Sequence, residues 1–313
     1  MGQNTTATIM MVRPVKFRLN EQTAVNNYYQ KALKGITSAE VEAKAMAEFD
    51  DFVEKLRSHG VEVVVIQDTA EPSTPDSVFP NNWISFHSDG TIGLYPMYAE
   101  NRRLERREDI MTTLVSQGFI INNRIDLTSA EDNNKFLEGT GSLIFDRKNR
   151  MAYAAISERT NPEVVKQFDA AFDFETVLFT SNQTVGDKRL PIYHTNVMMC
   201  IGDRFAVICL DTIDDQAERK MVVDSLEKSG KEIIEITEAQ KGCFAGNMLQ
   251  IENRNGEKFM VMSAAAHSVL TPDQIKDILK YNKDIISSSL DTIEALGGGS
   301  ARCMMAEVFL PKN

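Results

Sequence analysis

The stretch CMMAEV at residues 303–308 is the last of five segments that share one pattern, in which a small or polar residue precedes a run of mostly apolar residues. The other four are NWISFH from Asn82, GSLIFD from Gly141, NVMMCI from Asn196 and NMLQIE from Asn247. Their first residues lie 51 to 59 positions apart, and a period of this size is typical of repeat architectures. This repeat decides the predicted fold more than any single segment does.

Each repeat is predicted to contain a β-hairpin. In four of the five, the apolar run leads through a turn into a second apolar stretch: TIGLYPM (91–97), MAYAAIS (151–157), RFAVICL (204–210) and KFMVMSA (258–264). The fifth run meets the end of the sequence first, and the N-terminal stretch TATIMMVRPV (6–15) has no hairpin mate. We therefore expect this N-terminal strand to pair with the last run and to close the last unit of a single domain over residues 1–313.

Helical patterns lie between the hairpins. Thr37 and Glu40 form a capping-box pattern before an amphipathic stretch that runs to about His59. Further helices are predicted over about 101–117, over about 212–229, from Pro272, and over 285–296, with strands at VEVVVIQ (61–67) and EIIEI (232–236). The chain thus reads as an α/β-propeller of five pseudo-symmetric ββαβ units around a central channel, in which ring closure would remove exposed sheet edges.

Equivalent ends of repeated units face the same place in a closed ring. The first residues of the five runs, and the two polar residues just before them, are therefore expected to meet near the axis: Asn82, Gly141, Asn196, Asn247, Cys303, Glu138 and His194. A thiol, an imidazole and a carboxylate from distant parts of the chain would then share one small cavity.

Cys303 is the predicted nucleophile. It follows the stretch GGGSAR (297–302), whose glycines permit close substrate approach, and the adjacent Arg302 supplies a positive charge that favours a thiolate. The other three cysteines lack such a setting and are interpreted as structural: Cys200, Cys209 and Cys243.

His194 and Glu138 are the predicted partners of the thiol. An imidazole at this place could act as general acid and base, and a carboxylate could accept hydrogen bonds from substrate N–H groups. The remaining histidines are not chosen: His59 and His87 are read as surface or turn residues and His267 as the far end of a second strand. Asp76, before the first run, would add negative charge to the cavity.

Composition limits the partners. The chain has 313 residues, 42% of them hydrophobic, and a net charge of −11, which disfavours nucleic acid and anionic membrane surfaces. It contains neither a long unbroken apolar run nor a signal-peptide pattern, and its few scattered cysteines fit a reducing cytoplasm. The cysteines and histidines have no zinc-ligand spacing. We expect a cytoplasmic protein that binds a small molecule and no metal, with a homodimer as an allowed assembly.

These motifs, in this order, resemble the guanidino-group-modifying enzymes of the pentein fold along nearly the whole chain. PDSVFPNN (75–82) is similar to the first substrate loop of the dimethylarginine hydrolases, LEGTGS (137–142) to the family's Glu-Gly-Gly loop, HTN (194–196) to its His-x-Asp element and GGGSARC (297–303) to its approach to the nucleophile. The stretch at 11–30 resembles the amidinotransferase-related or citrulline-utilisation hydrolase branch.

The resemblance implies a covalent mechanism without a cofactor. Cys303 would attack the central carbon of the substrate, His194 would protonate the leaving nitrogen and then activate water, and Glu138 would orient the substrate nitrogens. Asp76, Asn81, Asn82, Asn196, Asn247 and Arg302 are the expected substrate-binding residues.

The substrate expected from the sequence is citrulline, which would give ornithine, ammonia and carbon dioxide. Family members that act on guanidinium commonly carry acids where this chain has Asn81, Asn82 and Asn196, and amides suit a neutral ureido group. Asp76 and Glu138 still supply negative charge, so an arginine deiminase or a dimethylarginine or succinylarginine hydrolase remains an alternative. An amidinotransferase and, from a different class, a non-catalytic binding factor of the same fold are further alternatives.

Overall fold

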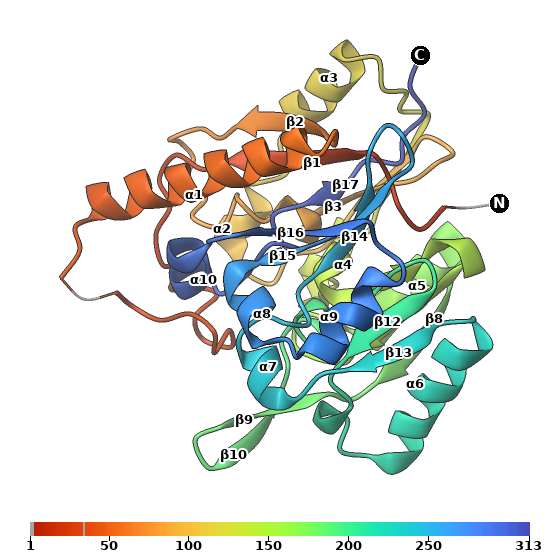
Figure 1. The fold of residues 1–313 in the computed structure, drawn as a ribbon. Helices are drawn as coiled ribbons and strands as arrows, with labels where there is room; N and C mark the ends of the chain where they lie inside the picture. The colour runs from red at the N-terminus through yellow and green to blue at the C-terminus, as the bar shows by residue number, and fades with distance from the viewer. Residues whose placement is uncertain (1–2, 34) are drawn as a thin grey trace.

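The computed structural model describes residues 3–33 and 35–313, in which the strands form six separate small sheets (Figure 1). Residues 1, 2 and 34 of the predicted domain lie outside the described residues. Five sheets have three strands each: β3 (Ile84–Phe86), β4 (Thr91–Leu94) and β5 (Asn123–Asp126); β6 (Ile144–Asp146), β7 (Met151–Ala155) and β8 (Glu175–Phe179); β11 (Met199–Ile201), β12 (Phe205–Ile208) and β13 (Glu232–Glu235); β14 (Leu249–Glu252), β15 (Lys258–Ser263) and β16 (Asp284–Ser288); β17 (Ala306–Glu307), β1 (Thr8–Arg13) and β2 (Glu62–Gln67). The sixth is the hairpin of β9 (Asn182–Val185) and β10 (Lys188–Pro191), which projects from the molecule (Figure 1).

All five three-stranded sheets are built alike. Two antiparallel strands are joined by a third that runs parallel to the second, as in β3–β4–β5. The four predicted hairpins are confirmed by the antiparallel pairs β3–β4, β6–β7, β11–β12 and β14–β15. In the fifth sheet β17 pairs antiparallel with β1, opposite Ile9 and Met10, and β1 pairs parallel with β2.

The first strands of neighbouring sheets lie against one another. β17 contacts β3, β6 contacts β11, and β11 contacts β14. Sheet hydrogen bonds do not continue from one of these sheets to the next in the described part of the chain, so no closed sheet forms there. What the structure establishes is an α/β fold of many small sheets, and the predicted removal of all sheet edges by closure is not met.

Helices connect the second and third strands of each sheet or lead into the first. Their bounds are α1 (Ser38–Ser58), α2 (Glu100–Arg103), α3 (Glu108–Ser116), α4 (Gly139–Ser142), α5 (Pro162–Phe172), α6 (Gln216–Lys228), α7 (Glu238–Gly242), α8 (Ala264–Val269), α9 (Pro272–Leu279) and α10 (Asp291–Gly297). Thr37 and Glu40 form the predicted capping box of α1. The sequence analysis missed α5, although Asn161 caps it and Pro162 occupies its first turn.

Two predicted helices are wrong in part. The stretch 101–117 is divided into α2 and α3, because Arg102 and Glu105 turn inward and pair with each other at 2.8 Å. The stretch 285–296 begins as strand β16, because Ile285 and Ile286 complete the parallel ladder beside β15, and becomes helical only in α10. In both places tertiary contacts override the local helical pattern.

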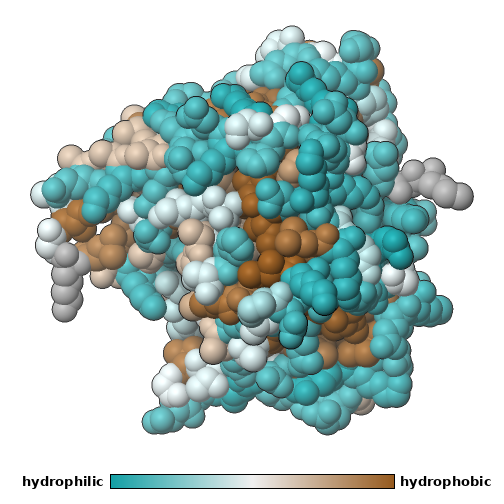
Figure 2. Space-filling model, viewed as in Figure 1, coloured by the Kyte–Doolittle hydropathy of each residue, from teal (hydrophilic) through white to brown (hydrophobic). Residues whose placement is uncertain are grey.

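The apolar core lies between the sheets and the outer helices. Helix α1 buries one face, including Phe49 and Phe52, against the sheet of β1 and β2. From the side drawn in Figure 1 the surface is largely hydrophilic, and hydrophobic residues show mainly near the middle of that face (Figure 2). Among the described residues, none of the helices is long and apolar enough to cross a membrane.

Candidate active site

The first residues of the five apolar runs lie at the entrance to the first strand of each sheet, and the loops that hold them touch. Short helices carry three of them: Asn82 in η1 (Pro80–Asn82), Gly141 in α4 and Asn196 in η4 (Thr195–Val197). Helix α4 contacts both η1 and η4. Asn247 donates from its side chain to the Asn196 carbonyl at 3.0 Å. The repeat positions are thus brought together, as the sequence pattern predicts.

Cys303 lies between two of these residues. Its Sγ accepts hydrogen bonds from Asn196 Nδ2 at 3.4 Å and from Asn247 Nδ2 at 3.3 Å. The Asn247 Oδ1 atom in turn accepts from the Arg302 backbone N–H at 3.1 Å. Cys303 is only 3% exposed and follows α10, whose C-terminal cap residue, Gly298, lies in the left-handed region. Two amide side chains therefore fix the position of the sulfur.

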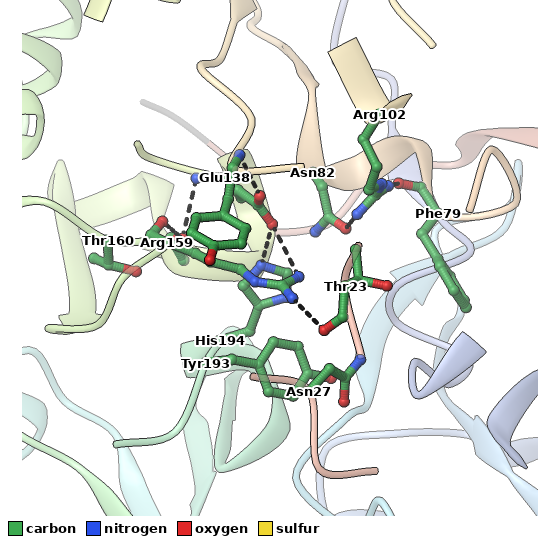
Figure 3. A network of polar contacts seen from close by, with 12 residues as sticks. Thr23, Asn27, Phe79, Asn82, Arg102, Glu138, Arg159, Thr160, Tyr193 and His194 are labelled. Carbon is green, nitrogen blue, oxygen red and sulfur yellow. Dashed lines mark hydrogen bonds and ion pairs between the residues drawn. The ribbon is translucent and has the colours of Figure 1, made fainter. Parts of the chain in front are cut away.

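His194 and Glu138 form a buried pair. His194 Nε2 lies 2.6 Å from Glu138 Oε2, and the Tyr98 backbone N–H donates to Glu138 Oε1 at 2.9 Å (Figure 3). Burial alone would raise the pKa of Glu138, but the charge of Arg159 and the His194 hydrogen bond outweigh it and lower that pKa to about 2. Burial lowers the pKa of His194 to about 4.

This electrostatic setting defines the proton positions at neutral pH. The Glu138 carboxylate is ionised and can only accept, so His194 Nε2 carries the proton of a neutral imidazole. Nδ1 is then a free base. A methyl group built on Gly141 would lie 2.9 Å from Nδ1 and 2.4 Å from Asn82 Nδ2, so both nitrogens face the same small space. Only glycine leaves that space open.

Two buried arginines complete the site, and the sequence analysis did not choose either. Arg159 lies 3.5 Å from Glu138 Oε2 and donates to the Thr23 carbonyl at 3.0 Å (Figure 3). Arg102 donates to Asn82 Oδ1 at 2.7 Å and forms a two-pronged pair with Glu105. The available signal was position, because Arg102, in the short helix α2, and Arg159, in the loop between β7 and α5, both lie at the end of the sheets that carries the repeat residues.

Asp76 is buried beside Arg102 on the same cavity. Its Oδ2 accepts from Asn20 Nδ2 at 2.8 Å and from Thr23 Oγ1 at 3.1 Å, while its Oδ1 has no partner among the described residues. Burial raises the pKa of this carboxyl, and Arg102 opposes that shift.

Not every predicted binding residue reaches the cavity. The Arg302 guanidinium turns away and pairs with the buried carboxylate of Glu307 at 2.8 Å. The Asn81 side chain turns to Thr140 at 3.2 Å, between loops. The expectation that Arg302 and Asn81 contact substrate is therefore corrected. Asp76, Asn82, His194 and Cys303 do line the cavity, with Glu138, Asn196 and Asn247 directly behind them.

The cavity is nearly closed as it stands. Thr23 and Asn27, from the segment 20–30, lie over it beside Tyr193 (Figure 3). Its free volume of about 10 Å³ leaves room for roughly one water molecule. A substrate therefore needs this N-terminal segment to move.

The remaining cysteines and histidines lie outside this site. Burial raises the pKa of Cys200 and of Cys209 to about 12, which suits inert structural thiols. His87, predicted to be a surface or turn residue, lies at the start of the turn after β3, where its carbonyl accepts from the Gly90 N–H at 3.0 Å, but it is buried, because it stacks on Phe172. His267 lies in helix α8 instead of at a strand end. The described residues contain no group of three His, Cys, Asp or Glu that could hold a metal ion.

Residues 13–310 match the model of the family described as N,N dimethylarginine dimethylhydrolase, eukaryotic. None of the curated proteins matches the sequence significantly.

Solved structures share the fold at low identity. The N-terminal domain of ArgZ, a cyanobacterial arginine dihydrolase, has a TM-score of 0.73 at 16% identity, over 96% of this chain and 97% of that one. Against the whole of ArgZ the TM-score is 0.74 at 15% identity, and this chain covers 41% of that longer protein. The DDAH of Pseudomonas aeruginosa, solved with citrulline, has a TM-score of 0.64 at 14% identity, over 97% of this chain and 99% of that one.

Proposed function

Because this chain belongs to the family described as eukaryotic N,N dimethylarginine dimethylhydrolases, within the pentein superfamily of guanidino-modifying hydrolases of C–N bonds, we propose that Cys303 attacks the central carbon of a ureido or guanidino amino acid. Citrulline is the proposed substrate. The observation that carries this proposal is that a thiol and a neutral imidazole lie around one cavity. Two amide side chains hold the thiol, and an ionised carboxylate holds the imidazole.

The proposed architecture is a single five-unit propeller over residues 1–313, with the cavity on its axis. Its support is the common build of the five sheets and the contacts between their first strands. The pairing of β1 with β17 supports closure of the last unit by the N-terminal strand.

In the proposed first half-reaction, His194 accepts the thiol proton of Cys303 and the thiolate attacks the ureido carbon. The imidazolium, stabilised by Glu138, then gives the proton to the departing nitrogen, so that ammonia leaves and an S-carbamoyl enzyme remains. In the second half-reaction His194 takes a proton from water, and the resulting hydroxide adds to the carbonyl carbon. The carbon–sulfur bond then breaks, the imidazolium returns its proton to the departing Cys303 thiolate, and the released carbamic acid decomposes to ornithine and carbon dioxide.

The polar atoms without partners favour a ureido group. Asn82 Nδ2 is an unpaired donor whose orientation is fixed, because Asn82 Oδ1 accepts from Arg102. Asp76 Oδ1 and Asn196 Oδ1 are unpaired acceptors in the described chain. A ureido group offers one acceptor oxygen and several N–H donors and so matches the two of these atoms whose residues line the cavity, Asn82 Nδ2 and Asp76 Oδ1, whereas a guanidinium, which only donates, would leave Asn82 Nδ2 unpaired.

The two buried arginines favour an amino acid over an amine. Arg102 and Arg159 both line the cavity, and because Glu105 already occupies the two-pronged edge of Arg102, the two guanidinium groups would attract a carboxylate by their positive charge. We propose that the substrate α-carboxylate binds between them, which disfavours agmatine.

Arginine is the second candidate. The observation that favours it is the negative charge of Glu138, with Asp76 beside the cavity, which would offset a guanidinium. ArgZ, which shares the fold, is named an arginine dihydrolase and is solved in one variant covalently bonded to a reaction intermediate. The four free cysteines support a reducing, cytoplasmic location for the reaction.

An ammonia-release assay on a panel of citrulline, arginine, dimethylarginine, agmatine and succinylarginine tests the proposal, with ornithine measured as co-product. We expect turnover of citrulline and little of agmatine. Turnover of arginine without citrulline would overturn the ureido assignment while leaving the covalent mechanism intact.

The nucleophile is tested with Cys303→Ser, which is expected to lose at least about 10³-fold in kcat. Cys243→Ser, at a half-buried thiol away from the cavity, is the matched control and should keep wild-type activity. Full activity in the Cys303 variant would refute the mechanism.

A further inference from the structure

A second cavity lies at the opposite end of the sheets from the candidate active site. It forms where the hairpin turns that follow β3 and β6 meet the residues after β17, and its free volume is about 350 Å³. The residues that matter here are His87, Arg147, Arg150, Phe172, Phe174 and Phe309. We call this space the turn-end cavity. None of its lining residues takes part in the proposed reaction.

Arg147 is the unusual group in the turn-end cavity. It is 8% exposed, and its buried Nε has no hydrogen-bond partner among the described residues. Its guanidinium carbon lies 4.7 Å from the centre of the Phe145 ring and 4.2 Å from that of Phe309, so two aromatic rings lie within cation–π distance of this charge. The nearby carboxylate of Glu307 is engaged by Arg302 at 2.8 Å.

In this setting the buried Arg147 cation lacks the ion-pair and hydrogen-bond partners that a buried charge usually has. Burial lowers the pKa of Arg147, and the charge of Glu307 opposes this only in part. Buried charges in proteins are normally paired or fully hydrogen-bonded, because desolvation without compensation is costly. The two rings offer no hydrogen-bond acceptor to the N–H edge of the guanidinium, where Nε has no partner among the described residues, and the edge of a guanidinium is what binds an oxyanion through two parallel bonds.

The residues around Arg147 define the size and charge of the ligand that would fit the turn-end cavity. Arg150 stands at the rim, over the Phe174 ring at 4.5 Å, and adds a second guanidinium. His87 is neutral, because burial and the two arginines hold its pKa well below the usual value. Asp89 and Asp173 also lie on the rim. Asp173 pairs with Arg150 at 3.5 Å, while Arg147 forms no ion pair among the described residues, so the uncompensated charge is the single one of Arg147, which suits a monoanion better than a dianion.

We propose that the turn-end cavity is a binding site for a small organic monocarboxylate, with the carboxylate on the edge of Arg147 and the apolar part against the rings of Phe172, Phe174 and Phe309. The three rings supply an apolar wall that inorganic phosphate could not use, and the rim acids would repel its second charge.

Calorimetric titration of the full-length protein with benzoate tests this proposal, with benzamide as the neutral isostere and inorganic phosphate as the dianion. We expect benzoate to bind at least about tenfold more tightly than either. Arg147→Gln should weaken benzoate binding at least tenfold, and Arg150→Gln should weaken it by less. Arg204→Gln, at the corresponding turn between β11 and β12, is the matched control and should bind as wild type.

Several outcomes would overturn the proposal: no benzoate binding at millimolar concentration, equal binding of benzamide, tighter binding of phosphate, or unchanged binding in Arg147→Gln. Because Arg147 is buried, its variant needs a circular-dichroism check. If the variant does not fold, the anomalous signal of 4-bromobenzoate in a crystal of the wild-type protein shows where the ligand binds. A bromine peak beside Phe309 and Arg147 supports the site, and peaks only in the candidate active site or on the surface refute it.

Discussion

His194 Nε2 lies 2.6 Å from Glu138 Oε2, and both side chains are almost completely buried. This contact joins the loop before β11 to the loop before β6, which are 56 residues apart in the sequence. It fixes the tautomer of the imidazole and places a counter-charge where an imidazolium would form. This pair and the residues that contact it give rise to four testable predictions.

Replacing Glu138 by Gln should lower kcat about 10²- to 10³-fold, because the imidazolium that forms in the reaction loses its counter-charge and His194 loses its orientation. Steady-state kinetics with citrulline measures this. Glu163→Gln, at an exposed carboxylate that pairs only with Lys135, is the control and should be neutral. A kcat within twofold of wild type in Glu138→Gln would contradict the assigned role.

The contribution of His194 to stability should fall as the pH is lowered from 6.5 to about 4, because burial lowers the pKa of His194 from 6.5 to about 4. Between these values the unfolded chain binds a proton that the folded chain does not, which costs on the order of 3 kcal/mol by pH 4. Glu138 contributes in the same direction: its pKa falls from 4.5 to about 2, so its stabilisation is present above pH 4.5 and is lost toward pH 2. Urea unfolding at several pH values measures the slope, which His194→Asn should reduce between pH 6.5 and 4. Identical slopes in the two proteins would show that His194 is not buried in its neutral form.

Arg159→Gln should release the segment 20–30 and raise the pKa of Glu138, because Arg159 holds the Thr23 carbonyl and is the main charge that lowers that pKa. We expect a KM increase of about tenfold or more, since a charge-assisted contact of about 1.5–3 kcal/mol is lost. Hydrogen exchange in residues 20–30 should become faster. Arg103→Gln, a partly exposed arginine beside Glu131, serves as control. Unchanged exchange would mean that Arg159 does not hold the segment closed.

Gly141→Ala should abolish most activity, because its methyl group would lie 2.4 Å from Asn82 Nδ2 and 2.9 Å from His194 Nδ1. Overpacking of this kind costs about 1–3 kcal/mol of stability. Thermal unfolding and kinetics together measure both effects. Gly242→Ala, where a methyl group would meet nothing within 4 Å, is the matched control and should leave both unchanged. Wild-type activity in Gly141→Ala would show that the space beside His194 is not used.

The repeat in the sequence was sufficient to predict the hairpins and the meeting of residues far apart in the chain. A period of 51 to 59 residues places Asn196, Asn247 and Cys303 at the same position of successive units, and like positions in like units meet when the units pack side by side. Local patterns were also sufficient for the capping box of α1, because that motif needs only residues within one turn.

Only the tertiary structure decided the charges and the contents of the cavity. Nothing near Arg159 or Arg102 in the sequence shows that Glu138 and Asn82 are their partners, because those contacts join segments that are distant in the sequence. The same holds for Arg302, whose neighbour Cys303 suggested a role at the sulfur, while its side chain turns to Glu307. The sequence determined which residues share a place in the repeat. The direction of each side chain depends on which charges and rings are within reach after the units have packed, and a one-dimensional pattern does not contain that information.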